Sequence, residues 1–273
     1  MLDGIFIDEE DDVGAFVMMI SISAVFFTVV SVLLAGKIVP FQVGQVNYGG
    51  LIAVFLATLS LSYPLTNYLR DRDHEEIANN WKETSILERH FEEMSVYVGL
   101  FFAATIGFGI SSFFMSDGFF TIQSMVLEGI RGNVTGNITA ATSFYTIFMN
   151  NLMVLGATFG LSFFISGGML FILLWNASVL GVLVGTISSS VAHIPIELMP
   201  YVVHGSVEVA AYVFAGFAGT LLAYHFEHYY VRGNHTKHSF RKVVADSIML
   251  ALLGVVAVLI GAVLETGYPL TLL

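Results

Sequence analysis

The chain has 273 residues, of which 56% are hydrophobic and only 11% are charged, and its formal net charge is −11. Soluble domains carry about 25% charged residues, so this composition indicates a protein embedded in a lipid bilayer. The acidic balance argues against nucleic acid as a partner. Because cysteine is absent, disulfides, thiolate metal sites and cysteine nucleophiles are excluded. The acidic first residues also lack the basic segment with which a secretory signal peptide begins.

A spanning helix needs about 20 mostly apolar residues, and the chain offers seven candidate segments. In chain order they are Gly14–Gly36, Gly49–Tyr68, Ser95–Met115, Asn151–Leu174, Ala177–Ile194, Gly205–Phe226 and Ala245–Leu264. The fifth is the weakest, since Ser188-Ser189-Ser190 makes one end polar and Pro195 ends it, so six spans are the alternative. The predicted fold class is all-α, a polytopic transmembrane helix bundle.

Basic residues predict the orientation of the bundle, because cytoplasmic loops are enriched in Lys and Arg. One predicted side holds eight, and the other holds only Lys37 and Arg131; the eight are Arg70, Arg72, Lys82, Arg89, Arg232, Lys237, Arg241 and Lys242. We therefore expect a multi-pass protein of the cell membrane with its N-terminus in the cytoplasm and its C-terminus outside. A tight turn at Trp175-Asn176 then faces the cytoplasm, and residues 117–149 lie outside.

Both long loops carry further predictions. In the cytoplasmic loop, Ile77–Met94 has apolar residues at helical spacing and predicts an amphipathic helix, which either lies on the bilayer or bundle or docks a cytoplasmic partner. The outer loop holds Asn133 and Asn137 in sequons, where glycosylation is expected if the loop is extracellular. Asn176 and Asn234 also open sequons, but they should be bare on the cytoplasmic side.

Four pairs of small residues stand four positions apart, so each pair lies on one helix face: Ala103/Gly107, Gly156/Gly160, Gly181/Gly185 and Ala215/Gly219. Small faces let helix backbones approach closely in lipid. The pattern favours tight packing within the bundle, and the alternative is a homodimer formed through one of these faces.

The most informative polar residues stand within or beside apolar segments. Glu208 is the one acidic residue of the apolar run Val207–Phe226, and His204 stands four residues earlier, on the same helix face. Asn150 and Asn151 open the fourth predicted span, where one asparagine would cap the helix. On the predicted topology these four residues lie at the outer ends of their helices and form one polar cluster. Its role is either structural or functional, because intramembrane ionisable groups are functional candidates.

Other chemistry is poorly supported. His225, His228, His235 and His238 lie near Glu227 with two His-x-x-His spacings, which favours a solvated loop over a zinc site because no second motif completes four ligands. The common hydrolase, metalloprotease, phosphate-loop and dinucleotide motifs are missing. The last span has no lysine for a retinal Schiff base. We expect no enzymatic activity, no cofactor and no metal.

The order of these motifs resembles the stage II sporulation protein M family: Asn150-Asn151, a glycine-rich span, Asn176 opening the next span, then His204-Gly205-x-x-Glu208 and an alanine- and glycine-rich span. The resemblance covers roughly residues 95–264. Residues 95–273 would be the family core, and residues 1–94 an addition that comprises the acidic tail, two helices and the amphipathic helix. Where the family usually has Asn-Gly, this chain has Asn176-Ala177. An acidic, cysteine-free chain with sequons is typical of an archaeal homologue.

The resemblance implies an integral membrane protein; its sporulation members anchor an assembly that includes peptidoglycan-degrading partners. Two functions follow as hypotheses. The first is a membrane scaffold that binds the bilayer, an envelope or cytoplasmic protein and a second copy of itself. The second is a permease in which Glu208 and His204 line a path for a proton, an ion or a small solute, driven by a cytoplasmic ATPase that docks on Ile77–Met94.

Overall fold

The computed structural model describes residues 13–38, 42–43, 46–78, 86–116, 118–135, 140–165, 167–187, 190–231 and 237–267. These ranges are almost entirely helical, as the composition predicts. The α-helices are α1 (Val13–Ile38), α2 (Gly49–Ala78), α3 (Ile86–Ser112), α4 (Thr121–Thr135), α5 (Ala140–Phe164), α6 (Gly168–Ile187), α7 (Ile194–Phe226) and α8 (Lys237–Gly267). A 3₁₀ turn, Val191–His193, precedes α7, and a π-helical turn, Glu227–Val231, follows it. The two-residue strands β1 (Gln42–Val43) and β2 (Val46–Asn47) pair antiparallel between α1 and α2.

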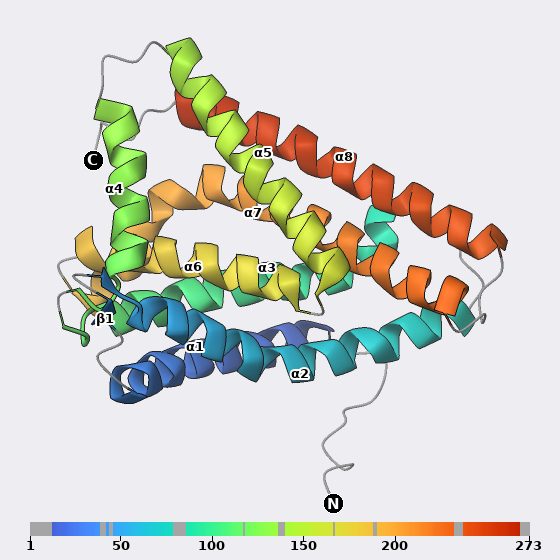
Figure 1. Cartoon of the computed structure of the whole chain (residues 1–273), viewed down its shortest axis with the longest axis horizontal. Helices are drawn as coiled ribbons and strands as arrows, with labels where there is room; N and C mark the ends of the chain where they lie inside the picture. Colours follow the sequence, from blue (N-terminus) through green and yellow to red (C-terminus); the bar gives the residue numbers. More distant parts are fainter. Residues whose placement is uncertain are drawn as a thin grey trace, which may run out of the picture.

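Within the described ranges, six helices are long and apolar enough to cross a membrane: α1, α3, α5, α6, α7 and α8. The predicted second span is the exception, because the apolar part of α2, Gly49–Leu65, is shorter. At 1.5 Å per residue it measures about 25 Å, against a hydrocarbon core of about 30 Å. In Figure 1, α2 nevertheless runs beside α1 along the bundle, while α4 stands across one end.

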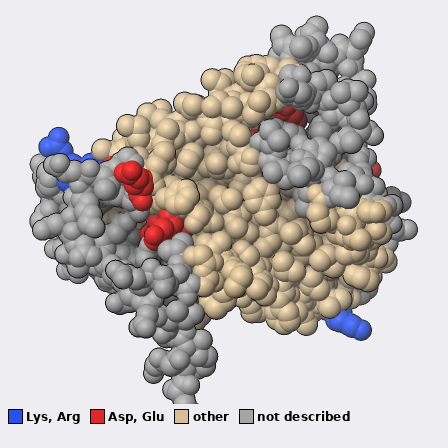
Figure 2. Space-filling model, turned by 180° about the vertical axis from the view of Figure 1, so that it is seen from behind, with Lys and Arg blue, Asp and Glu red and all other residues tan. Residues whose placement is uncertain are grey.

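The interior of the bundle is built around α3, α6 and α7. Helix α3 packs against α1 and α6, and α7 packs against α5 and α8. About two thirds of the α3 span (67%) is buried, against 22% for α5, so α5 turns most of its surface toward lipid. Figure 2 shows the described charged side chains near the edges of one face, with a broad uncharged area between them. That distribution is the one expected of a surface in contact with hydrocarbon.

The small residues bring helices into backbone contact. A Cβ added to Gly181 of α6 would lie 2.6 Å from the Thr105 carbonyl oxygen and 2.8 Å from the Gly109 nitrogen of α3. Gly219 of α7 meets the Phe159 carbonyl oxygen of α5 in the same way. Packing inside the bundle is therefore confirmed for these two faces.

The small face of α5 behaves differently. Gly156 is exposed and has nothing within 4 Å of an added Cβ, and the same open space surrounds Gly160. Among the described residues, no other helix of the chain therefore packs against Gly156 and Gly160. A homodimer through this face stays a prediction.

The predicted turn at Trp175-Asn176 is wrong. The break between α5 and α6 lies about ten residues earlier, where Gly167 has a φ of +84°, a conformation that glycine adopts without steric cost. Gly168 then packs against the Leu161 carbonyl oxygen. Trp175 and Asn176 lie in the middle of α6, where the amide of Asn176 donates to the Ile172 carbonyl oxygen at 2.8 Å.

Two further helix boundaries differ from the prediction. Pro195 does not end a helix but stands in the first turn of α7, where its missing N–H costs no hydrogen bond. Ile77–Met94 is not one helix, because α2 ends at Ala78 and α3 begins at Ile86. Its apolar stripe fails too, since Phe91 is 66% exposed while His90 and Glu93 are buried.

Candidate functional site

Asn151, on α5, links two helices through its side-chain amide. Its Nδ2 donates a hydrogen bond of 2.7 Å to Oε1 of Glu208 on α7. Its Oδ1 accepts a hydrogen bond of 2.9 Å from the hydroxyl of Tyr212, one turn further along α7. Asn151 and Tyr212 are 7% and 4% exposed. Because both ends of the amide are occupied, its orientation is fixed by the network.

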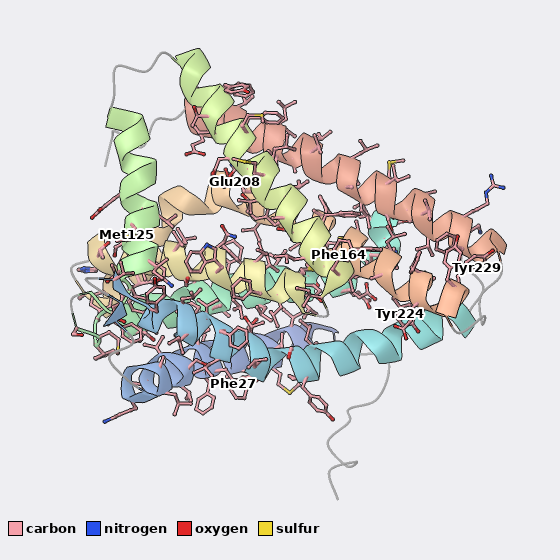
Figure 3. The ribbon with its side chains drawn as sticks, viewed as in Figure 1. Phe27, Met125, Phe164, Glu208, Tyr224 and Tyr229 are labelled. Carbon is pink, nitrogen blue, oxygen red and sulfur yellow. The ribbon has the colours of Figure 1, made fainter. Side chains whose placement is uncertain are left out.

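Helix α8 completes the cluster from the other side. Glu265 of α8 is close enough to Glu208 for the two carboxyl groups to interact electrostatically. One turn earlier on the same face of α8, Gly261 packs against the Glu208 side chain: an added Cβ would lie 3.0 Å from its Cγ and 3.6 Å from its Oε1. Glu208 therefore sits between α5 and α8, both of which pack on α7 (Figure 3). We call Asn151, Glu208, Tyr212 and Glu265 the carboxyl cluster.

The cluster lies deeper along its helices than the sequence predicts. Asn151 is about 16 Å from the first residue of α5, and Glu208 is about 21 Å from the first residue of α7, at 1.5 Å per residue. Asn151 is therefore no N-cap, and the positive end of the α7 dipole does not reach Glu208, since that effect fades within the first turn. The hydrogen bonds of Asn151 to Glu208 and Tyr212 stabilise these polar groups instead.

The other residues singled out in the sequence fare differently. Asn150 is exposed and points away from the buried side of α5. The side chain of His204 and the whole of Asn137 lie outside the described residues, as does the side chain of Asn133 at the end of α4. Asn176 was expected to open a helix, but it lies in the middle of α6, where its side-chain amide donates to a backbone carbonyl oxygen of the same helix.

Two members of the cluster were missed from the sequence. Glu265 lies one residue beyond the last predicted span, so the sequence predicts a loop at this position. In the structure, α8 continues to Gly267. Tyr212 reads as an ordinary aromatic residue of an apolar helix. For Tyr212 a signal existed, because it stands four residues after Glu208 and so lies on the same helix face.

The histidine-rich stretch after α7 is only partly described. His225 is 3% exposed and its Nδ1 lies 3.1 Å from the Leu221 carbonyl oxygen, so it belongs to the bundle rather than to a loop. His235 lies outside the described residues, and so do the side chains of His228 and His238. In the part of the chain that the structure describes, no three His, Asp or Glu residues gather as metal ligands would.

A sequence model of the family described as "Stage II sporulation protein M" matches residues 15–267. The matched residues include α1 and α2. No curated protein and no solved structure matches the chain. The polar residues of α5 and α7 stand in the order that suggested this resemblance, and the match extends over nearly the whole bundle. The chain therefore belongs to the stage II sporulation protein M family.

Proposed function

We propose that this protein is a non-enzymatic membrane scaffold, a fixed helical platform that anchors an envelope or cytoplasmic protein at the bilayer. The observation that carries the proposal is the backbone packing of its glycines. At Gly181 and Gly219, neighbouring helices approach so closely that a single methyl group would meet backbone atoms. Packed interiors resist continuous deformation, so this arrangement suits a rigid anchor better than a transporter whose helices must move.

The carboxyl cluster supports the same function. Its hydrogen bonds connect side chains of α5 and α7, and interhelical polar bonds are a known means of holding membrane helices together. On this proposal Glu208 acts by fastening helices. The archaeal origin suggested by composition would exclude a peptidoglycan-linked role but leaves the scaffold function intact.

A permease is the second candidate, and one observation favours it. Glu208 and Glu265 are two ionisable groups within membrane-spanning segments, and such groups often mark proton or ion pathways. On this alternative Glu208 releases and rebinds a proton during transport. Glutamine cannot do so, which separates the two functions.

Proton flux into proteoliposomes distinguishes the candidates. We expect wild-type protein, reconstituted with a trapped pH-sensitive dye, to conduct no faster than protein-free vesicles under an imposed pH gradient and potential. Glu208→Gln should behave identically and should retain whatever protein co-purifies in stoichiometric amount with the wild type. Wild-type flux that Glu208→Gln abolishes, with folding unchanged, would establish the permease instead.

The orientation belongs to this proposal: the N-terminus and the connections after α2 and α7 lie in the cytoplasm. The charge bias toward those connections supports it. Because the chain has no cysteine, single cysteines report cleanly. Glu88→Cys at the start of α3 should react with a membrane-impermeant maleimide only after lysis. Glu128→Cys, exposed on α4, should react in intact cells, and the reverse pattern would invert the topology.

A further inference from the structure

We propose that a second copy of this chain binds to the lipid-facing side of α5, and that the two copies are joined through Asn150. The inference assigns a partner and the surface that binds it, and it applies to a scaffold and to a permease alike. It rests on an asparagine that faces hydrocarbon, on the spacing of the exposed residues along α5 and on the open space beside its glycines.

Asn150 is a polar side chain at a position where only lipid is expected. It is exposed, and it lies within the membrane-spanning part of α5, Phe144–Phe164, about 9 Å from the first residue of that segment. No hydrogen bond joins its amide to another described residue. Hydrocarbon supplies neither donors nor acceptors, so an unpaired amide is costly there. Asparagine also lacks the long stem with which lysine and arginine reach the headgroups.

The lipid-facing side of α8 shows how this chain meets hydrocarbon elsewhere. Every exposed residue from Ile248 to Val263 is apolar, as a surface in contact with acyl chains requires. Asn150 departs from that pattern in the middle of another exposed helix. The difference indicates that this part of α5 is covered by a polar partner in the assembled protein.

The exposed residues of α5 are spaced like the seam of a two-helix coiled coil. Alternating intervals of three and four residues separate Asn150, Met153, Ala157, Gly160 and Phe164, so they form one stripe along the helix. All of them are exposed except Gly160, which is half-buried. A stripe with this period faces a neighbouring helix along its whole length, and a single asparagine within it fixes the register of the pair.

A second copy supplies the partner that Asn150 lacks. Copies of a membrane protein share one orientation in the bilayer, so a two-fold axis along the membrane normal brings two α5 helices together in parallel. Asn150 of one copy then faces Asn150 of the other at the same depth. The asparagine amide carries both donors and an acceptor, so the two side chains can bond to each other in a symmetric pair.

Small residues let the two helices approach closely further along the stripe. Among the described residues, nothing lies within 4 Å of a Cβ added to Gly156 or Gly160, and Ala157 between them is also small. Such faces allow the backbones of membrane helices to come into contact. The dimer would leave the carboxyl cluster intact, because Asn151 bonds to Glu208 from a different face of α5.

Disulfide cross-linking in membranes of the expression host tests the contact, since the chain has no cysteine of its own. Met153→Cys, on the stripe, should form a covalent homodimer after mild oxidation. Leu252→Cys is the matched control, because Leu252 is 56% exposed on α8 and Met153 is 64% exposed on α5; it should stay monomeric. Equal cross-linking of both variants, a monomeric Met153→Cys, or its cross-link to a different polypeptide would overturn the proposal.

Dimer dissociation in liposomes measures the contribution of Asn150 itself. Donor and acceptor dyes are attached at Glu128→Cys, an exposed position of α4, and energy transfer is followed as lipid is added. We expect Asn150→Leu to raise the dissociation constant roughly tenfold, whereas Asn150→Gln keeps a donor and an acceptor and should remain closer to the wild type. Melting temperatures confirm that both variants fold. A folded Asn150→Leu that dimerises as tightly as the wild type would refute the role of Asn150.

Discussion

Replacing Gly181 with alanine should lower the free energy of unfolding by about 1–3 kcal/mol, the usual cost of overpacking a close-packed interior. The new methyl group would lie 2.6 Å from the Thr105 carbonyl oxygen and 2.8 Å from the Gly109 nitrogen. Both are backbone atoms, so relief requires α3 and α6 to move apart. Unfolding in mixed micelles of increasing denaturing detergent measures the difference.

Gly156→Ala is the matched control, since it makes the same change in another apolar helix, α5. Nothing lies within 4 Å of an added Cβ at this position, and alanine favours a helix by up to about 1 kcal/mol over glycine. Its unfolding curve should match that of the wild type or shift toward greater stability. Equal destabilisation of both variants would show that glycine acts through helix flexibility and not through packing.

Replacing Glu208 with alanine should cost about 1–3 kcal/mol of stability, because it leaves the Asn151 amide inside the bundle without its acceptor. Glu208→Gln should be close to the wild type at neutral pH. Its amide oxygen can accept the hydrogen bond from Asn151 in place of the carboxylate. Melting temperatures in one detergent distinguish the two variants, and wild-type-like melting of Glu208→Ala would remove the structural role.

The sequence predicts the helices well where one physical effect dominates. Hydrophobicity alone places α1, and its predicted limits, Gly14–Gly36, differ from the structure by one or two residues. Hydrophobicity does not predict where α5 ends and α6 begins, because the whole stretch is apolar and its composition marks no boundary. The turn depends on the backbone conformation of Gly167, and a Ser-Gly-Gly sequence between apolar segments was the available signal.

The sequence predicts some residues of the carboxyl cluster and not others. Glu208 stands out because a carboxyl group in an apolar helix is costly, and Asn151 stands out as a strong hydrogen-bonding group beside a long apolar run. Their contact follows from the meeting of α5 and α7, as the predicted shared depth suggests. The role of α8 could not be foreseen, because which face it turns toward α7 is set by packing at Gly261, and no local pattern specifies that choice.

The central claim is that the hydrogen bond between Asn151 and Glu208 fastens α5 to α7, and a double-mutant cycle measures it most directly. Free energies of unfolding are determined for the wild type, Asn151→Ala, Glu208→Ala and the double variant. We expect the double variant to lose much less than the sum of the single losses, giving a coupling energy within the range of about 0.5–3 kcal/mol for residues in contact. Strict additivity would contradict the claim, because the two side chains would then contribute independently of each other.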